Sequence, residues 1–413
     1  MCIRYGVASH MSDDLLYLCP YEAPIAMRHG PGWMSDVGED QMALRVEKAV
    51  SPATGMVTLV LVDDDTYMVH SPAKDFAMSL RAAGRSTNTA KAYLPRICRF
   101  LNWAADQAVD WRTIGLADLG RFKISVEQAP TPSGGKKTGK TVNATLTAVC
   151  EFLRFSAAHG HADSQVAIRL SEPKFLRYAP TGFHPGESGQ FRTIQARVLK
   201  APEIENAPEI IRSEDEASLF EGARSARDRF LIAVLVGTAL RIGEALGLRR
   251  GDLHMLPDSS HLGCSTQGAH LHVVPRLDNS NGALAKSGRP RFVPVPAWIV
   301  GRYRDHLLER ETVPGSAGSD YVFINILGRY AGGPMTYSNA KQIIERVGRT
   351  GGFRARPHMM RHTAATRWIR AGIPTDVVQT LLGHASQSST AVYVHAYDED
   401  LRAAVDCVEA ASK

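Results

Sequence analysis

The sequence lacks any run of about 18 consecutive apolar residues, so no membrane-spanning helix is predicted. Its N-terminus has no basic stretch followed by an apolar segment, and no secretory signal is expected. Cysteine is scarce, with six residues scattered through the chain and no CxxC pair. This scatter argues against a disulfide framework and against a zinc site, and it indicates a protein of the reducing cytoplasm.

The net charge of +6 is unevenly distributed along the 413 residues. Residues 1–71 hold 4 Lys and Arg against 10 Asp and Glu, a net charge of −6. Residues 72–190 hold 16 against 9, a net charge of +7, and residues 191–413 hold 28 against 23, a net charge of +5. Two basic segments behind an acidic one favour a nucleic acid as the partner of the basic part, although many soluble proteins are equally basic.

The domain organisation of the chain can be predicted from the spacing of its apolar residues and from its prolines and glycines. We predict a partly disordered N-terminal extension over 1–71, with a β-hairpin at 56–70 around an Asp-rich turn. Helical spacing of apolar residues predicts a bundle over 72–171 that carries a basic Gly-rich loop at 131–141. Five prolines and no periodicity predict a linker over 172–212. A second domain is expected over 213–413.

This second domain mixes helices and strands. Residues 227–248 are apolar enough for two buried helices that meet at Gly237–Thr238. Strands are expected at 269–275 and 291–296, with a third at 321–325, and helices return from residue 357 to the end. The fold class is therefore mainly α with a small β-sheet.

Two cations stand out in this domain. Arg241 lies in an otherwise apolar helical segment, where an unpaired charge would cost several kcal/mol. A salt bridge to Glu244, one helical turn away, is the structural alternative to a functional role. Lys286 is expected at the tip of the hairpin between the first two predicted strands, where most lysines are simply solvated.

A third cluster spans residues 357–395. His358 and Arg361 are three residues apart and share a helix face. His384 follows an apolar helix end, and Tyr393 comes nine residues later. His358 and His362 also have the HxxxH spacing of a zinc helix, but Met359 stands where an HExxH protease needs Glu.

Together these segments resemble the tyrosine recombinases, the phage integrase family. TALRIGEALGLRRGDL resembles the first arginine motif, AKSGRPRFVPVP the lysine hairpin, and HMMRHTAAT with LLGHASQSSTAVYVH the C-terminal motif. STNTAKAYLPRICRFLNW resembles the start of the N-terminal core-binding bundle. Each motif alone is weak, but their order is specific. The resemblance covers about 72–400, departs from the family in an insertion at 254–284, and extends weakly to transposable-element recombinases.

The resemblance implies a catalytic set and a chemistry. The implied catalytic residues are Arg241, Lys286, His358, Arg361, His384 and the nucleophile Tyr393. Tyr393 would form a covalent 3′-phosphotyrosine, so ligation needs no cofactor. The two arginines would bind the scissile phosphate, Lys286 would protonate the leaving 5′-oxygen, and no metal is expected. His358 would assist proton transfer at Tyr393, and His384 would bind the phosphate.

The implied function is site-specific recombination of double-stranded DNA by a tetramer assembled on two synapsed sites. Lys136, Lys137 and Lys140 in the Gly-rich loop are expected to contact phosphates. Accessory recombinases are further candidate partners. A type IB topoisomerase-like nicking and closing enzyme and a non-catalytic DNA-binding regulator remain as alternatives.

Overall fold

The protein is described from a computed structural model. The structure describes residues 17–18, 43–52, 55, 57–132, 134–176, 193–203, 208–285, 287–384 and 393. The chain divides into two compact units, Met1–Arg177 with Pro185–Glu205 and Tyr178–His184 with Asn206–Lys413. No helix in the described ranges is both long enough and apolar enough to cross a membrane. The predicted fold class, mainly helical with small sheets, is confirmed.

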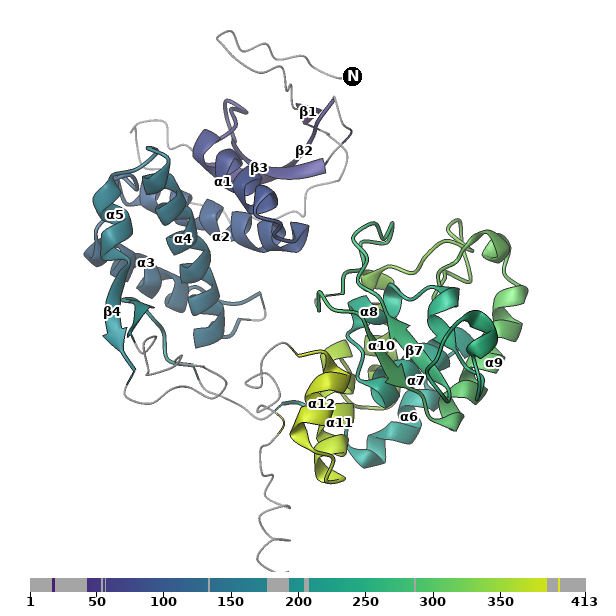
Figure 1. The fold of residues 1–413 in the computed structure, drawn as a ribbon. Helices are drawn as coiled ribbons and strands as arrows, with labels where there is room; N and C mark the ends of the chain where they lie inside the picture. Colours follow the sequence, from purple (N-terminus) through teal and green to yellow (C-terminus); the bar gives the residue numbers. More distant parts are fainter. Residues whose placement is uncertain are drawn as a thin grey trace, which may run out of the picture. The chain divides into compact units, whose positions relative to one another are not determined.

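The first unit is a helical bundle capped by a small sheet (Figure 1). Its helices are α1 (Ser71–Ala82), α2 (Thr87–Asp106), α3 (Leu116–Gln128), α4 (Gly139–Ala158) and α5 (Ser164–Arg169). Phe76, Phe100, Phe122 and Phe152 are buried between them. Strands β1 (Tyr17–Leu18), β2 (Leu44–Val50) and β3 (Val57–Asp63) form an antiparallel sheet. Buried Leu61 joins the same apolar core as the helices.

The hairpin that we predicted at 56–70 lies elsewhere. Strand β3 pairs along its whole length with β2, from Leu44↔Asp63 to Val50↔Val57. The Asp-rich turn is present, because the Asp63 carboxylate accepts hydrogen bonds from the backbone and hydroxyl of Thr66. Beyond the turn only the bridge Val62↔Val69 forms, since His70 already caps helix α1.

Part of the predicted linker is folded. Strands β4 (Ser171–Phe175) and β5 (Thr193–Arg197) pair antiparallel. Asn143 on α4 holds the segment that follows β5 by bonding both the N–H and the carbonyl of Ala201. These contacts cross many residues of sequence, so proline content alone could not reveal them.

The second unit packs helices around a buried helix and a three-stranded sheet (Figure 1). Its helices are α6 (Glu216–Glu221), α7 (Ala226–Thr238), α8 (Ile242–Leu246), α9 (Ala297–Glu311), α10 (Tyr337–Thr350), α11 (Pro357–Arg370) and α12 (Thr375–Leu382). Short 3-10 turns lie at Ser213–Asp215, Arg250–Asp252, Ser260–Leu262 and Ser316–Gly318. The antiparallel sheet contains β6 (Leu253–His254), β7 (His270–Val273) and β8 (Arg291–Pro294), in that order.

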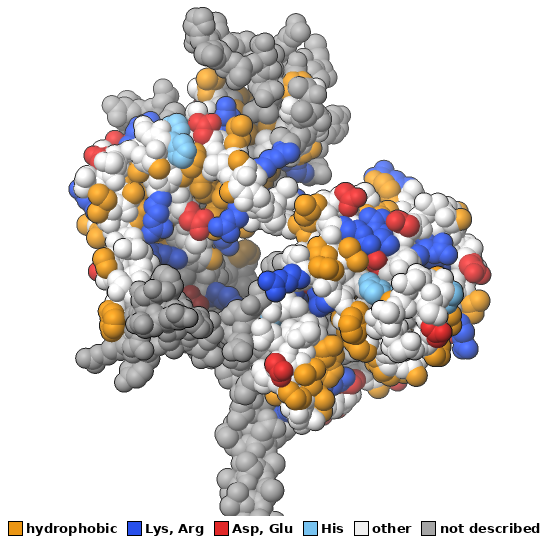
Figure 2. All heavy atoms as spheres, in the orientation of Figure 1, with side chains coloured by type: hydrophobic (Ala, Val, Ile, Leu, Met, Phe, Trp, Pro, Cys, Tyr) orange, Lys and Arg blue, Asp and Glu red, His pale blue; other side chains and the backbone are white. Residues whose placement is uncertain are grey.

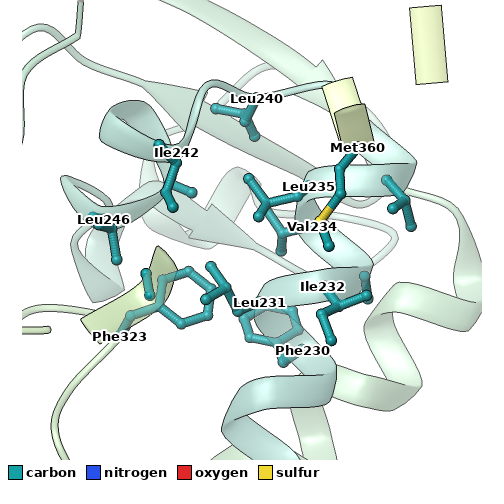
Figure 3. Packing of buried hydrophobic residues seen from close by; sticks show 14 of the residues in the cluster. Phe230, Leu231, Ile232, Val234, Leu235, Leu240, Ile242, Leu246, Phe323 and Met360 are labelled. Carbon is teal, nitrogen blue, oxygen red and sulfur yellow. The ribbon is translucent and has the colours of Figure 1, made fainter. Parts of the chain in front are cut away.

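Beyond its charged first turn, helix α7 is apolar on all sides and almost fully buried. Figure 3 shows Phe230, Leu231 and Leu235 of this helix packed among side chains of other elements. Those partners include Ile242 and Leu246 of α8, Phe323, and Met360 of α11. Helix α7 thereby fixes the relative positions of α8, which directly follows Arg241, and of α11, which contains Arg361.

One predicted strand is absent. Residues 321–325 form only the isolated bridges Arg249↔Tyr321 and Ile324↔Pro334, and the third strand of the sheet is β6 instead. The apolar run at 321–325 is buried because Phe323 and Ile324 face the core, not because it pairs along a sheet.

Candidate active site

Arg241 lies in the turn between two helices rather than inside one. Helix α7 ends at Thr238, Ala239 adopts a left-handed conformation with φ 52°, and Arg241 is the N-cap of α8. Its backbone N–H donates to the Glu244 carboxylate at 2.9 Å, and its Nη1 donates to the same carboxylate at 3.1 Å. The salt bridge that we considered as an alternative therefore exists, and it orients a guanidinium that remains 21% exposed.

Glu244 is shared by two arginines. Its side chain is fully buried, and Nη2 of Arg291 on β8 lies 2.8 Å from its second carboxylate oxygen. Burial alone would raise the pKa of Glu244, but hydrogen bonds and charge from Arg291 and Arg241 hold this pKa below its usual value. An ionised Glu244 thus holds both guanidinium groups in place.

Arg361 on α11 is buried at the centre of the site. Its Nη1 donates to the Ala239 carbonyl at 2.5 Å, and its Nη2 donates to the Leu382 carbonyl at 2.9 Å. The same Nη2 lies 2.8 Å from Nε2 of His384. Burial and the charge of nearby Arg241 lower the pKa of Arg361 to about 10, so it stays protonated at neutral pH.

Tyr393 packs against this arginine and two histidines. Its ring is nearly parallel to that of His384, with an interplanar angle of 9° and centroids 6.2 Å apart. Its hydroxyl lies 3.1 Å from Nδ1 of His362. Burial raises the pKa of Tyr393, and the positive charges of Arg361 and Arg241 oppose that rise. The phenol is therefore protonated at neutral pH and needs a proton acceptor before it can attack.

His358 is one helical turn before His362, the residue whose Nδ1 lies beside the tyrosine hydroxyl. It lies at the exposed start of α11, and its ring centroid is 6.3 Å from that of His362. Sequence reasoning had noted His362 only as half of an HxxxH pair. The structure thus brings Arg241, Arg361, His384 and Tyr393 together and places His362 beside the tyrosine hydroxyl.

Two further groups of predicted residues are Lys286 and the lysines of the Gly-rich loop. Lys286 is outside the described residues. Lys136 and Lys140 are exposed in the first unit, whereas Lys137 is half-buried. Burial and the charge of Arg99 lower the pKa of Lys137.

Sequence reasoning also missed Arg291. Strand alternation points it to the same face as Val293, which is buried two residues later. The alternation of side chains along the predicted strand at 291–296 could therefore have indicated that Arg291 faces inward.

Lys and Arg side chains gather on the face of the second unit that Figure 2 shows.

Residues 203–400 match the model of the phage integrase family. The chain is 28% identical over 354 residues to transposase A from transposon Tn554 of Staphylococcus aureus, covering 83% of this chain and 92% of the relative. It is 27% identical over 315 residues to tyrosine recombinase XerD of Mycobacterium leprae, covering 75% and 86%. The chain carries a phage integrase family domain over residues 203–400, and its relatives are tyrosine recombinases and transposases. It is accordingly an enzyme of site-specific DNA breaking and rejoining.

Solved structures agree on the fold. The Tn1549 transposon integrase in complex with circular intermediate DNA aligns with a TM-score of 0.54 at 16% identity, covering 82% of this chain and 99% of that one. The XerH recombinase bound to difH DNA aligns with a TM-score of 0.54 at 19% identity, covering 82% and 85%. The recombinase fold thus extends over both units of this chain.

Proposed function

We propose that Tyr393 is the nucleophile of this recombinase. The observation that carries the proposal is its buried hydroxyl, which lies beside a histidine nitrogen and near two arginines. The phenolic oxygen attacks the scissile phosphorus, a 3′-phosphotyrosine forms, and the 5′-oxygen of the cut strand leaves as a hydroxyl. The reverse attack by a 5′-hydroxyl reseals a strand and frees the tyrosine, so no high-energy cofactor is consumed.

Arg241 and Arg361 are proposed to hold the scissile phosphate. A guanidinium is a planar fork that bonds two phosphate oxygens at once and retains its charge. The buried contacts of Arg361 with the Ala239 and Leu382 carbonyls fix its plane before DNA arrives. This preorganised positive charge is suited to the additional negative charge of the pentavalent transition state.

Protons must move at both ends of the reaction. His362 is placed to accept the phenolic proton, and His358 is the histidine that the family pattern assigns to this step. His384 lies against Arg361 and is proposed to bond the phosphate. Lys286 retains its proposed role as the acid that protonates the leaving 5′-oxygen.

The substrate is proposed to be double-stranded DNA at a specific site. The XerH and Tn1549 integrase structures are complexes with DNA. We propose that residues 72–171 form a DNA clamp and 213–413 the catalytic domain, with transposition or integration of a mobile element as the biological reaction. The topoisomerase and regulator alternatives are not favoured, because the relatives are recombinases and transposases.

A covalent adduct assay tests the proposed nucleophile. DNA from the borders of the element that carries the gene would be nicked near the cleavage site, so that religation is prevented. Wild-type protein should form a denaturant-resistant adduct, also in EDTA, while Tyr393→Phe should form none and bind DNA within a few-fold of wild type. Adduct formation by the Phe variant would reassign the nucleophile, with Tyr397 the nearest candidate.

We also propose a tetramer on two synapsed duplexes, because two duplexes cut on both strands need four active sites. Residues 398–413, which lie outside the described residues, have Leu401, Ala404, Val405 and Val408 at helical spacing. Removing the chain after Asp400 should leave DNA binding by a monomer intact and abolish synapsis. Native gels of the protein with DNA that carries one recombination site or two would measure both. Loss of every activity together with a lower melting temperature would instead mean that this segment packs on its own domain.

A further inference from the structure

A cluster of four potential metal ligands lies in the second unit, within residues 254–272. His254, Cys264, His270 and His272 each offer one ligand atom, and these atoms all lie within 4.8 Å of one another. His254 and His270 are buried, and Cys264 and His272 are half-buried. None of the four belongs to the set around Tyr393, and the scattered cysteines of the sequence gave no sign of the cluster.

Strand pairing assembles three of these ligands. His254 on β6 is the cross-strand partner of His270 on β7. His272 follows two residues later on β7 and therefore points to the same face of the sheet. Their rings pack edge to face, with centroids between 4.6 and 4.9 Å apart.

The fourth ligand comes from the loop between the two strands. This loop folds back on itself, since the N–H of Gly268 donates to the Pro257 carbonyl at 2.8 Å. Gly263, with φ 75°, ends the short 3-10 turn directly before Cys264. The turn brings the Cys264 sulfur to 3.4 Å from Nε2 of His270 and 3.5 Å from Nε2 of His272.

These distances are close to the edges of a zinc tetrahedron. With Zn–N of about 2.05 Å and Zn–S of about 2.3 Å, two nitrogens lie about 3.3 Å apart and a nitrogen and a sulfur about 3.6 Å apart. The observed Nε2–Nε2 distance between His270 and His272 is 3.0 Å. Small rotations of the rings would open the cluster around an ion.

The surroundings favour ligands over ordinary hydrogen-bonded side chains. Nδ1 of His270 lies 2.7 Å from the Gly268 carbonyl, which fixes the proton on Nδ1 and leaves the Nε2 lone pair facing the cluster. Metal-binding histidines commonly have such a second hydrogen bond. Nδ1 of His254 is buried and has no hydrogen-bond partner among the described residues, a cost that coordination through this nitrogen would offset.

We propose that His254, Cys264, His270 and His272 bind one Zn²⁺ in a closed, four-coordinate structural site. Three imidazoles and one thiolate form a ligand set that suits zinc, and a fourth protein ligand leaves no position for a substrate. Binding releases the thiol proton of Cys264 to solvent and involves no redox change. The ion would hold the loop 255–269 against the β6–β7–β8 sheet. Strand β8 of this sheet carries Arg291.

Metal content tests this site directly. Full-length protein without a histidine tag, grown with zinc and dialysed, should hold about one zinc per chain by mass spectrometry. Cys264→Ser and His272→Ala should each reduce the zinc to background. His261→Ala is the matched control, because His261 is exposed in the same loop and lies outside the cluster, and it should retain the zinc.

Cobalt provides a second readout that does not depend on whether the variants fold. Metal-free wild-type protein titrated with Co²⁺ should show the visible bands of tetrahedral cobalt and a near-ultraviolet thiolate band that saturate at one ion per chain. Zinc should displace the cobalt and raise the melting temperature of the metal-free protein by about 5 °C or more. Wild-type protein with background zinc and no cobalt bands would overturn the proposal and leave a purely hydrogen-bonded cluster.

Discussion

The hydroxyl of Tyr393 lies 3.1 Å from Nδ1 of His362, a residue adjacent in sequence to Arg361. The family pattern instead assigns His358, one turn earlier on α11, to proton transfer. The two histidines lie four residues apart on one helix, with ring centroids 6.3 Å apart. Substituting His362 and substituting His358 are therefore expected to affect cleavage differently.

His362→Ala should slow adduct formation about 100-fold, the lower end of the usual contribution of a general base. The phenol of Tyr393 would lose its hydrogen-bond acceptor while Arg241 and Arg361 still bind the phosphate. Single-turnover cleavage of a nicked substrate at saturating enzyme measures this rate. His358→Ala is the matched comparison, and a larger loss there than at His362 would mean that His358 is the main acceptor of the phenolic proton.

The pH dependence of cleavage should lack a histidine step near neutrality. Burial, with the charges of His358 and Arg361, lowers the pKa of His362 to about 4, so the ring stays a neutral acceptor down to about pH 5. The single-turnover rate should show no inflection between pH 6 and 7, the range in which an unperturbed histidine titrates. A rate that halves near pH 6.5 would contradict this prediction. His358→Ala removes one cause of the lowered pKa and should move the acid limb to higher pH.

The lowered pKa of His362 also makes the stability of the fold depend on pH, because the folded and unfolded chains bind different numbers of protons. An unfolded histidine titrates near pH 6.5, so between that value and about pH 4 the unfolded chain binds more protons than the folded chain. The melting temperature should therefore fall as the pH is lowered through this window. His384 adds to the effect, because burial and the charge of Arg361 lower its pKa to about 4 as well.

The residues that the structure brings together around Tyr393 were predictable from the sequence, but their contacts were not. Residue order and type indicated Arg241, Arg361, His384 and Tyr393, and helical spacing placed His358 and Arg361 on one helix. Spacing cannot distinguish His358 from His362, because the position of Tyr393 depends on α12 and on the left-handed Gly383 turn before His384. The His and Cys cluster depends on the β6–β7 register, which no local pattern encodes.

Glu244→Gln should impair the site without altering its shape. The substitution removes the negative charge that Arg241 and Arg291 share, so two guanidinium groups lose their compensating charge. Breaking a buried ion pair in this way costs about 3 kcal/mol or more. We expect a lower melting temperature and at least a tenfold slower cleavage at saturating DNA. Glu214→Gln is the control, because its pair with Arg212 is exposed and should leave both measurements unchanged.

The Gly-rich loop of the first unit should contribute to affinity for any DNA sequence. Residues 72–190 carry a net charge of +7, and Lys136 and Lys140 are exposed just before and within the first turn of α4. Each phosphate that a lysine neutralises releases counterions and steepens the dependence of log affinity on log salt by about 0.9. Changing Lys136, Lys137 and Lys140 to Ala should flatten the slope of log affinity against log salt by up to about 2.7. The same change should weaken binding to specific and to unrelated DNA by the same factor.

A single-residue comparison separates this loop from a general loss of positive charge. Lys140→Ala should lower the slope by up to about one unit. Lys123→Ala removes the same charge from the same unit, but Lys123 is paired with Glu127 at 2.7 Å on α3 and should change the slope less. Equal slopes for wild type and the triple variant, measured by fluorescence anisotropy over a salt series, would exclude the loop from the DNA interface. A triple variant that weakened only specific DNA would instead mean that these lysines read the sequence of the site rather than its phosphates.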